Sequence, residues 1–216
     1  MTTLATARPT LSSRLREGTR EEHESAESSG FISRLMSGDL GTDAYVSLAS
    51  QQYFVYSALE AIADDVRALP QGGSLIFSEL TRTPSIVRDL EHLVGPDWQS
   101  SVRALPATER YVATLHASST SLPRYAAHAY TRYLGDLSGG QIIKRMLERH
   151  YGLGPEGITF YSFEEIPKSK PFKDVYRERL DTLELSEDEL AEAVVEAKAA
   201  FRLNQDLFGE LGAQHC

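Results

Sequence analysis

The sequence predicts an all-α fold in one domain, and three observations support this prediction. Apolar residues recur at three- and four-residue steps along most of the chain, whereas the alternation typical of strands is scarce. Proline and glycine mark the ends of most of these periodic stretches. With 216 residues the chain can bury a substantial core and suits a single domain. We therefore expect one domain over 1–216, with 1–10 as a disordered N-terminal segment and 212–216 as a C-terminal tail.

The first two expected helices differ in character. Residues 11–29 are strong helix formers, although the segment is very polar. Residues 43–69 carry apolar side chains at helical spacing, which predicts a helix with one buried face that ends at Pro70. This apolar stripe consists of Tyr45, Leu48, Ala49, Tyr53, Tyr56, Leu59 and Ile62.

Local signals place the later elements. Thr83 followed by Pro84 predicts a helix start, with the threonine as cap and the proline at the first helical position. The stretch SEDE, which begins at Ser186, is a capping box that opens the last helix. Residues 151–169 look irregular, with aromatic side chains that pin a loop. The later helices are expected over 83–94, 107–117, 123–150, 170–183 and from the capping box to about 211.

Composition excludes several classes of protein. A formal net charge of −9 argues against nucleic-acid binding, which draws its affinity from Lys and Arg. The only cysteine is Cys216, so no disulfide can form within the chain. No segment has the apolar length of a signal-peptide core or of a membrane span. We expect a soluble, cytoplasmic monomer with no membrane and no nucleic acid among its partners.

The stretch RYLGDLSGGQ places three glycines, Gly135, Gly139 and Gly140, inside an expected helix. Each glycine costs about 1 kcal/mol relative to alanine in a helix, so some benefit must offset them. Another helix can approach closely, the helix can bend at the glycine pair, or a flat ligand can lie directly against the bare backbone. The spacing alone does not separate these alternatives. Asp136 stands beside the bare strip and Arg132 lies one turn before it, which favours a ligand site.

One of the six histidines has a carboxylate one helical turn away. Glu27 can accept the Nδ1 proton of His23, which would leave Nε2 to bind a metal. The sequence HESAE differs from the zinc-protease motif HExxH because Glu27 replaces the second histidine ligand, which excludes that chemistry. A surface histidine on a charged helix is the simpler alternative, and both stay open.

The stretches REEHESAE, RYLGDLSGGQ and KDVYRERL together resemble the heme oxygenases, and the whole chain is similar to soluble bacterial members in length and motif order. The resemblance implies a helical bundle in which heme is sandwiched between a proximal and a distal helix. His23 matches the iron ligand, and Glu27 matches the carboxylate that hydrogen-bonds it. Gly135 and Gly139 match positions where the backbone of the distal helix lies over the porphyrin.

The resemblance also implies the activity. Heme b (iron protoporphyrin IX) serves as both cofactor and substrate, and O2 with reductant converts it to biliverdin, CO and Fe2+, with the IXα isomer expected. Asp136 matches the distal acid, which delivers protons through an ordered water. The family's network around this acid matches Tyr56, Arg132 and Asn204. Electrons come from a reductase or a ferredoxin.

The heme propionates need cations or hydrogen-bond donors, and the resemblance assigns this task to Arg16, Tyr130, Lys173 and Arg177. The family commonly has lysine at the position of Arg16, and the change from a point charge to a planar fork affects how the heme is seated. Phe201 and Phe208 can wall the site or only pack the last helix. A basic rim for an acidic electron donor consists of Arg16, Arg20, Lys173, Arg177 and Arg179.

Three other functions use related features. A heme-storage or transfer protein has the same pocket without turnover, but it needs no positioned acid. A di-iron oxidase requires several carboxylates with paired Glu-x-x-His signals, and the sequence has none. A thiamin-degrading enzyme requires a nucleophilic cysteine in the pocket, whereas Cys216 is the last residue. Heme turnover for iron acquisition and heme turnover for another purpose are both compatible with the sequence.

Overall fold

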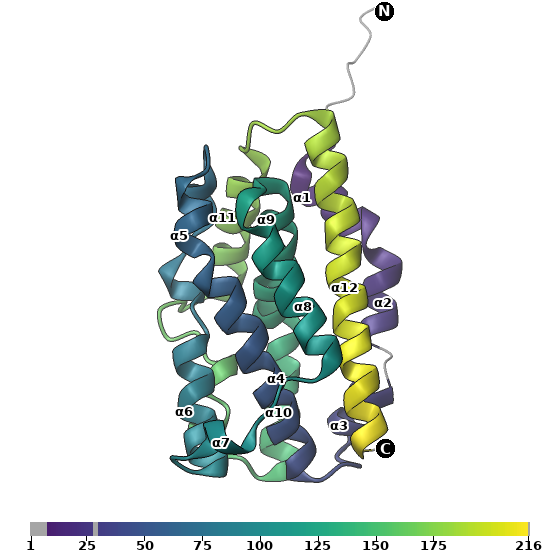
Figure 1. The fold of residues 1–216 in the computed structure, drawn as a ribbon, viewed down its shortest axis with the longest axis vertical. Coiled ribbons are helices and arrows are strands. Elements are labelled where there is room, and N and C mark those ends of the chain that lie inside the picture. Colours follow the sequence, from purple (N-terminus) through teal and green to yellow (C-terminus); the bar gives the residue numbers. More distant parts are fainter. Residues whose placement is uncertain (1–7, 28–29, 216) are drawn as a thin grey trace, which may run out of the picture.

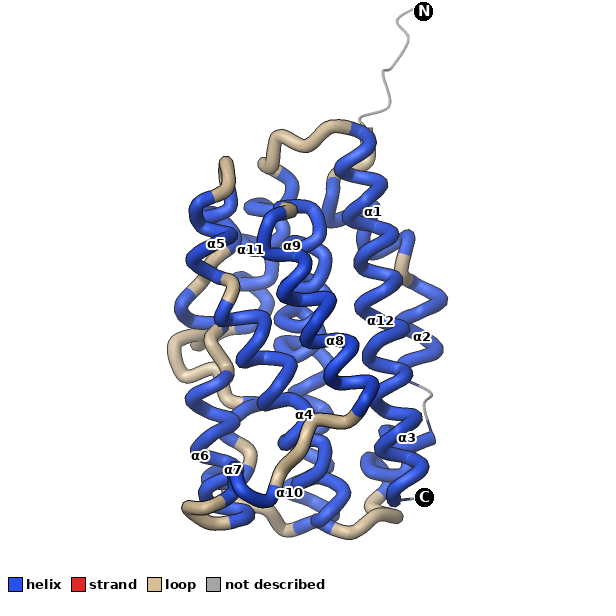
Figure 2. Tube along the Cα trace, viewed as in Figure 1, coloured by secondary structure: helices blue, strands red, loops and turns tan. Residues whose placement is uncertain are grey.

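The computed structural model describes residues 8–27 and 30–215, without the side chain of Glu27. All regular structure in these residues is helical, which confirms the predicted all-α class (Figure 2). No helix within the described ranges combines the length and apolarity that a bilayer span requires. Most of the segment 1–10, which we expected to be disordered, lies outside the described residues.

The polar N-terminal segment forms two helices where the sequence predicts one. These are α1 (Leu11–Gly18) and α2 (Arg20–Glu27), and Thr19 separates them. The Thr19 hydroxyl donates to the Leu15 carbonyl at 2.7 Å, so the side chain competes with the helical ladder at the break. A third helix, α3 (Gly30–Ser37), was not predicted.

The apolar stripe forms the centre of the molecule. The predicted helix over 43–69 is divided into α4 (Thr42–Ala61) and α5 (Ala63–Ala68), with Ile62 between them. Every residue of the stripe is buried except Tyr53, which is half-buried. The helical period therefore identified the buried face correctly.

Helix α6 (Thr83–Val94) begins where predicted, but Thr83 does not cap it. The Glu60 carboxylate of α4 accepts from the backbone amides of Arg82 and Thr83 instead. A partner 22 residues away leaves no local signal, so the sequence suggested the nearest hydroxyl. Two helices follow, a short α7 (Trp98–Ser101) that was not predicted and α8 (Pro106–Ala117), which begins at its proline as expected.

The predicted helix over 123–150 is present, but its middle has a different geometry. It begins as α9 (Leu122–Ala129) and ends as α10 (Gln141–Tyr151). Between them lie two π-helical segments, Tyr130–Leu134 and Asp136–Gly140, with Gly135 at their junction. We call 130–151 the distal helix because it carries the glycine-rich stretch.

The C-terminal part contains the irregular segment and two helices. Residues 152–168 hold only two short 3-10 turns, and α11 (Ser169–Asp181) follows. Helix α12 (Glu187–His215) opens with the predicted capping box, in which the Ser186 amide donates to Glu189 and the Glu189 amide to Ser186.

Helix α12 is longer than predicted. Residues 212–215 are helical where a tail was expected, because the His215 ring bonds Ser47 at 3.0 Å and lies 3.3 Å from the Asp43 carboxylate. Both partners belong to α4, so the end of the chain is fastened to the central helix. Cys216 lies outside the described residues.

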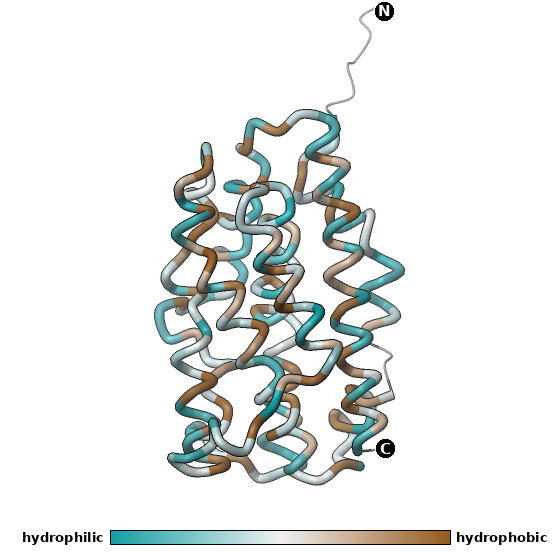
Figure 3. Tube along the Cα trace, in the orientation of Figure 1, coloured by the Kyte–Doolittle hydropathy of each residue, from teal (hydrophilic) through white to brown (hydrophobic). Residues whose placement is uncertain are grey.

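Helix α12 runs along the length of the molecule and packs against α9, α8, α3, α1 and α2 (Figure 1). Helix α4 packs against α6 and α8 and contacts α12. Hydrophobic and hydrophilic residues alternate along the helices (Figure 3), and the buried apolar side chains form one continuous core. The distal helix therefore lies between α12, α3 and α11, which bring its glycine-rich stretch near side chains from both ends of the chain.

Candidate functional site

The three glycines of the distal helix serve two different purposes. A Cβ atom at Gly135 or at Gly139 meets nothing within 4 Å, so the backbone there faces open space. A Cβ atom at Gly140 lies 3.2 Å from Cδ1 of Tyr161, a close packing contact. Close helix packing therefore does not explain Gly135 and Gly139, whereas close packing against an aromatic ring does explain Gly140.

The backbone around these glycines is also unusual. π-helical geometry is rare, and single π turns inside α-helices occur frequently at functional sites. The second π segment starts at Asp136, and the first contains Arg132. The wider turn changes the angular position of both side chains relative to a regular α-helix, so both are aimed by the same local feature.

A hydrogen-bonded network joins the distal helix to α4 and α12. The Tyr56 hydroxyl donates to Asp136 Oδ2 and accepts from Arg132 Nε at 3.2 Å. Arg132 also donates from Nη1 to Asn204 Oδ1 at 2.6 Å, and its guanidinium carbon lies 4.7 Å from the centre of the Tyr56 ring. We call Tyr56, Arg132, Asp136 and Asn204 the acid network. The structure thus brings together all four residues that the resemblance grouped around the distal acid.

Burial raises the pKa of the Asp136 carboxyl from its ordinary value of 3.8 to about 6, and the Arg132 charge, the Tyr56 hydrogen bond and the Arg82 charge limit that rise. The pKa of Tyr56 is raised well above its ordinary value, chiefly by burial. Burial lowers the pKa of the Arg132 guanidinium, but Tyr56, Tyr111 and Asp136 raise it by more. The guanidinium therefore stays charged. The network therefore holds one fixed cation beside an acid that exchanges protons near neutral pH.

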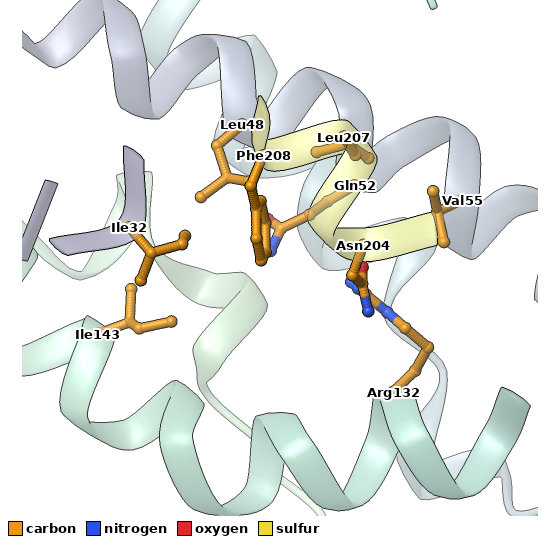
Figure 4. Close-up of a pocket in the computed structure, with 9 residues that line it drawn as sticks. All are labelled: Ile32, Leu48, Gln52, Val55, Arg132, Ile143, Asn204, Leu207 and Phe208. Atoms are coloured by element: carbon orange, nitrogen blue, oxygen red, sulfur yellow. The ribbon is translucent and has the colours of Figure 1, made fainter. Parts of the chain in front are cut away.

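A small pocket adjoins the acid network (Figure 4). It has a volume of about 40 Å³, enough for a water-sized molecule and far too little for a macrocycle. Gln52, Arg132 and Asn204 are its polar lining residues, and Phe208 projects from α12 among the apolar ones. Phe208 therefore lines this small pocket, and its role as a wall of the larger site stays a prediction.

His23 lies exposed on α2, next to an aromatic residue of α12. The centres of the His23 and Phe201 rings are 5.8 Å apart in an edge-to-face arrangement, and Phe201 itself is buried. The backbone of Glu27 completes α2, but its side chain lies outside the described residues. Among the residues that the structure describes, no group of three or more His, Cys, Asp or Glu side chains can hold a metal ion.

Polar contacts fix the helix that carries His23. The Glu22 carboxylate lies 3.2 Å from Lys198 Nζ on α12, and the Glu22 carbonyl accepts from Gln205 Nε2 at 3.2 Å. Both contacts connect α2 to α12, the helix that also supplies Asn204 to the acid network. Helix α12 therefore contacts both the helix that carries His23 and the acid network that contains Asp136.

Cationic side chains gather near the glycine-rich stretch. Lys173 Nζ donates to Ser138 Oγ at 2.7 Å, which joins α11 to the second π segment. The charges of Arg177 and Arg16 both lower the pKa of Tyr130, which burial raises, so these three residues lie within electrostatic reach of one another. The structure therefore brings the four residues expected at the propionates to one part of the molecule.

Two aromatic residues that support the site were not among the residues the sequence singled out. The Phe160 ring lies 5.2 Å from the Tyr56 ring, and Tyr161 lies beneath Gly140. Both are buried, although they belong to the irregular segment 152–168. The only available signal was the aromatic cluster in FYSF, which indicated a pinned loop without indicating its target.

The family model described as heme oxygenase matches residues 9–210 of the chain. Heme oxygenase of Porphyra purpurea is 40% identical over 205 residues, which cover 94% of this chain and 87% of that protein. Heme oxygenase 1 of Rattus norvegicus is 38% identical over 207 residues, covering 94% and 72% of the two chains. The structure of heme oxygenase-1 from the cyanobacterium Synechocystis in complex with heme is 36% identical, with a TM-score of 0.90 and coverage of 95% and 93%.

The two kinds of glycine contact predict opposite effects of alanine on the stability of the heme-free protein. Gly135→Ala and Gly139→Ala each raise the free energy of unfolding by about 0.5–1 kcal/mol, because alanine favours helical backbone and the added methyl group has room. Gly140→Ala gains less or loses stability, because Tyr161 must move. Urea unfolding of the three variants measures this order. If Gly140→Ala were the most stable of them, the distinction between the glycines would be wrong.

The raised pKa of Asp136 predicts a pH-dependent stability. The folded carboxyl binds its proton more tightly than the unfolded one, so this contribution to stability is lost as the pH rises from about 4 to above 6. Asp136→Asn removes the charge and raises the free energy of unfolding at pH 8 by about 1–3 kcal/mol, with no gain at pH 4. Urea unfolding at both pH values measures the difference. The exposed Asp97→Asn serves as control, and an equal effect of Asp136→Asn at both pH values would contradict the raised pKa.

Proposed function

The chain belongs to the heme oxygenase family, and from this membership we propose how its own residues degrade heme to biliverdin. The activity is that of an oxidoreductase for which heme is the substrate, and we propose heme b as the form it accepts. When bound, the heme supplies the iron that activates dioxygen and the porphyrin that is cleaved. The observation that carries the proposal is the acid network, which holds Asp136 beside the open backbone of Gly135 and Gly139.

We assign the iron ligand to His23. Its imidazole is exposed on α2 and therefore accessible, and ion pairs and hydrogen bonds fix α2 on α12. Phe201 supports one edge of the ring and limits its orientation. Glu27 follows one turn later in the sequence, where its carboxylate can orient the imidazole and set its tautomer.

The open backbone at Gly135 and Gly139 is proposed to face the opposite side of the porphyrin. Any side chain at these positions would occupy the space that the ring and the oxygen need. The two glycines destabilise the helix, and the proposed benefit that offsets this cost is the space they leave for the substrate. Gly140 has an indirect role, because its contact with Tyr161 sets the distance between the distal helix and the segment that contains Tyr161.

Asp136 is proposed to supply protons to the reacting oxygen through a water molecule. An acid whose pKa lies about one unit below neutral pH donates and recovers protons readily. Arg132 and Tyr56 hold its carboxylate in one orientation, and Asn204 holds Arg132. The adjoining pocket is large enough for an ordered water.

The propionate groups are proposed to meet Arg16, Tyr130, Lys173 and Arg177. Lys173 donates to Ser138 beside the glycine-rich stretch, and its ammonium group has two further protons to offer a propionate. Arg16 is exposed, and its guanidinium lies 3.8 Å from the carboxylate of its neighbour Glu17. A planar guanidinium can bind a carboxylate with two donors, which favours a single seating of the ring and supports the IXα product.

The electron donor is proposed to be a reductase or a ferredoxin with an acidic docking surface. Arg16, Arg20 and Arg179 are exposed, and Lys173 and Arg177 are half-buried. These five cations can attract an acidic partner although the whole chain carries a net charge of −9. We further propose a cytoplasmic setting, because a chain whose single cysteine is Cys216 does not depend on internal disulfides.

A turnover assay distinguishes heme cleavage from heme storage. Protein loaded with heme and given ascorbate under air should lose its Soret absorption and release a green bilin, because the acid network supplies protons. Asp136→Ala should keep its heme and form bilin at least about 100-fold more slowly, the lower end of what a general acid contributes. A protein that stays red would be a storage protein. An unchanged bilin yield in Asp136→Ala would remove the carboxyl from the reaction.

His23→Ala tests the iron ligand separately. Removal of the imidazole should change the heme spectrum and lower turnover at least about tenfold, because metal affinity and activity depend on the ligand. Added imidazole should restore part of both, since it can occupy the vacated position. His116→Ala, which removes an exposed histidine on α8, is the matched control. Full turnover by His23→Ala without imidazole would mean that another residue holds the iron.

A further inference from the structure

Arg82 is a buried cation outside the acid network. It lies at the start of α6 with 5% of its surface exposed. Its guanidinium donates to the Leu80 carbonyl at 3.2 Å and to the Phe160 and Ser162 carbonyls at 3.1 and 2.9 Å. The Phe163 ring covers it, with its centre 4.0 Å from the guanidinium carbon. Arg82 therefore connects the start of α6 to the segment 160–163.

The segment 160–163, which Arg82 holds, packs against the acid network and against the glycine-rich stretch. Phe160 packs on the ring of Tyr56, and Tyr161 packs beneath Gly140. The Tyr161 carbonyl also accepts from Gln141 Nε2 at 2.8 Å, at the first residue of α10. The ring of Tyr56 and the backbone at Gly140, four residues after Asp136, thus rest on one short stretch of chain.

The partners of Arg82 are unusual for a buried charge. A buried cation is costly unless it is paired, yet the guanidinium forms no ion pair with any carboxylate in the described part of the chain. Its hydrogen-bond partners are neutral carbonyls, and the carboxylate of Glu60 binds the Arg82 backbone amide instead. A neutral side chain could fill this volume at lower cost, so the charge itself calls for an explanation.

We propose that Arg82 is a positioning residue for heme cleavage, which clamps 160–162 under Tyr56 and the distal helix and places a fixed positive charge behind Asp136. The inference rests on the proposed role of Asp136 as proton donor. The Arg82 guanidinium hydrogen-bonds carbonyls and not the Asp136 carboxylate, so it acts through the packing of Phe160 and Tyr161 and through its charge.

The ionisable groups that influence Asp136 come from several elements. Arg132 belongs to its own helix, Tyr56 to α4, and Arg82 to the start of α6. The buried hydroxyls of Tyr111 on α8 and Tyr161 in the irregular segment also lie within electrostatic reach. Only the two arginines are positive, so the loss of either charge makes the Asp136 carboxylate harder to ionise.

The experiment uses the heme-free full chain and three variants. Arg82→Met removes the charge and keeps the volume, Arg82→Lys keeps the charge without the planar fork, and Arg88→Met removes an exposed arginine of the same helix. Carboxyl-carbon NMR measures the titration midpoint of Asp136, and amide hydrogen exchange measures the protection of 136–141. Circular dichroism checks that each variant is folded.

Arg82→Met should shift the Asp136 midpoint upward by about half a pH unit or more and increase exchange in 136–141 severalfold. Arg82→Lys should keep the wild-type midpoint and still increase the exchange, because one ammonium cannot replace the fork. Arg88→Met should change neither. In the loaded enzyme, the bilin yield of Arg82→Met should fall severalfold while heme remains bound.

A wild-type midpoint and wild-type protection in Arg82→Met would overturn the proposal. If Arg82→Met does not fold, unchanged exchange in Arg82→Lys would overturn it equally. The carboxyl titration and the amide hydrogen exchange need neither heme nor oxygen. A failure of wild-type turnover would therefore refute the proposed function without bearing on the effect of Arg82 on Asp136.

Discussion

The structure depends on the contact of Arg132 with Tyr56 and Asn204, because these three side chains come from the distal helix, α4 and α12. The guanidinium is partly buried and bonds a residue of each neighbouring helix, so these bonds favour one register of the three helices. That register also fixes where Asp136 lies, since Tyr56 bonds both groups. The same interaction that stabilises the packing of three helices therefore aims the acid on which the proposed chemistry depends.

The distal helix combines features that weaken a helix with contacts that restore its position. Two successive π segments and two unpacked glycines lower its intrinsic stability. Compensation comes from outside the helix, through Tyr161 beneath Gly140, Gln141 bonded to the Tyr161 carbonyl, and Lys173 bonded to Ser138. A helix with this balance can keep its backbone bare at Gly135 and Gly139 and still hold Asp136 in place. The unusual helical geometry is thus confined to the stretch that we propose meets the ligand.

Local sequence signals predicted the parts of the fold that local physics decides. The stripe around Tyr56 gave the buried face of α4, and Ser186 with Glu189 gave the start of α12. The break at Thr19 depends on a side-chain bond that a strong helix-forming segment conceals. The end of α12 depends on His215 reaching Asp43 and Ser47, residues distant in sequence and invisible to any local pattern.

In the site too, the sequence predicted what neighbouring residues determine and missed what residues distant in sequence determine. The spacing of Gly135, Asp136 and Gly139 predicted a bare strip beside an acid, whereas Tyr56 and Asn204 entered only through the resemblance to a family. They lie 80 and 72 residues from their partners on the distal helix, so only tertiary structure brings them together. The sequence did not predict the π turns, although it allowed a bend at the glycine pair.

The most direct measurement is a crystal structure of the heme-loaded protein. We expect the iron bound to Nε2 of His23, the main chain of Gly135 and Gly139 against the opposite face of the porphyrin, and Asp136 on that same side. An iron held by any other side chain, or a porphyrin seated away from these glycines, would contradict the assignment of the site.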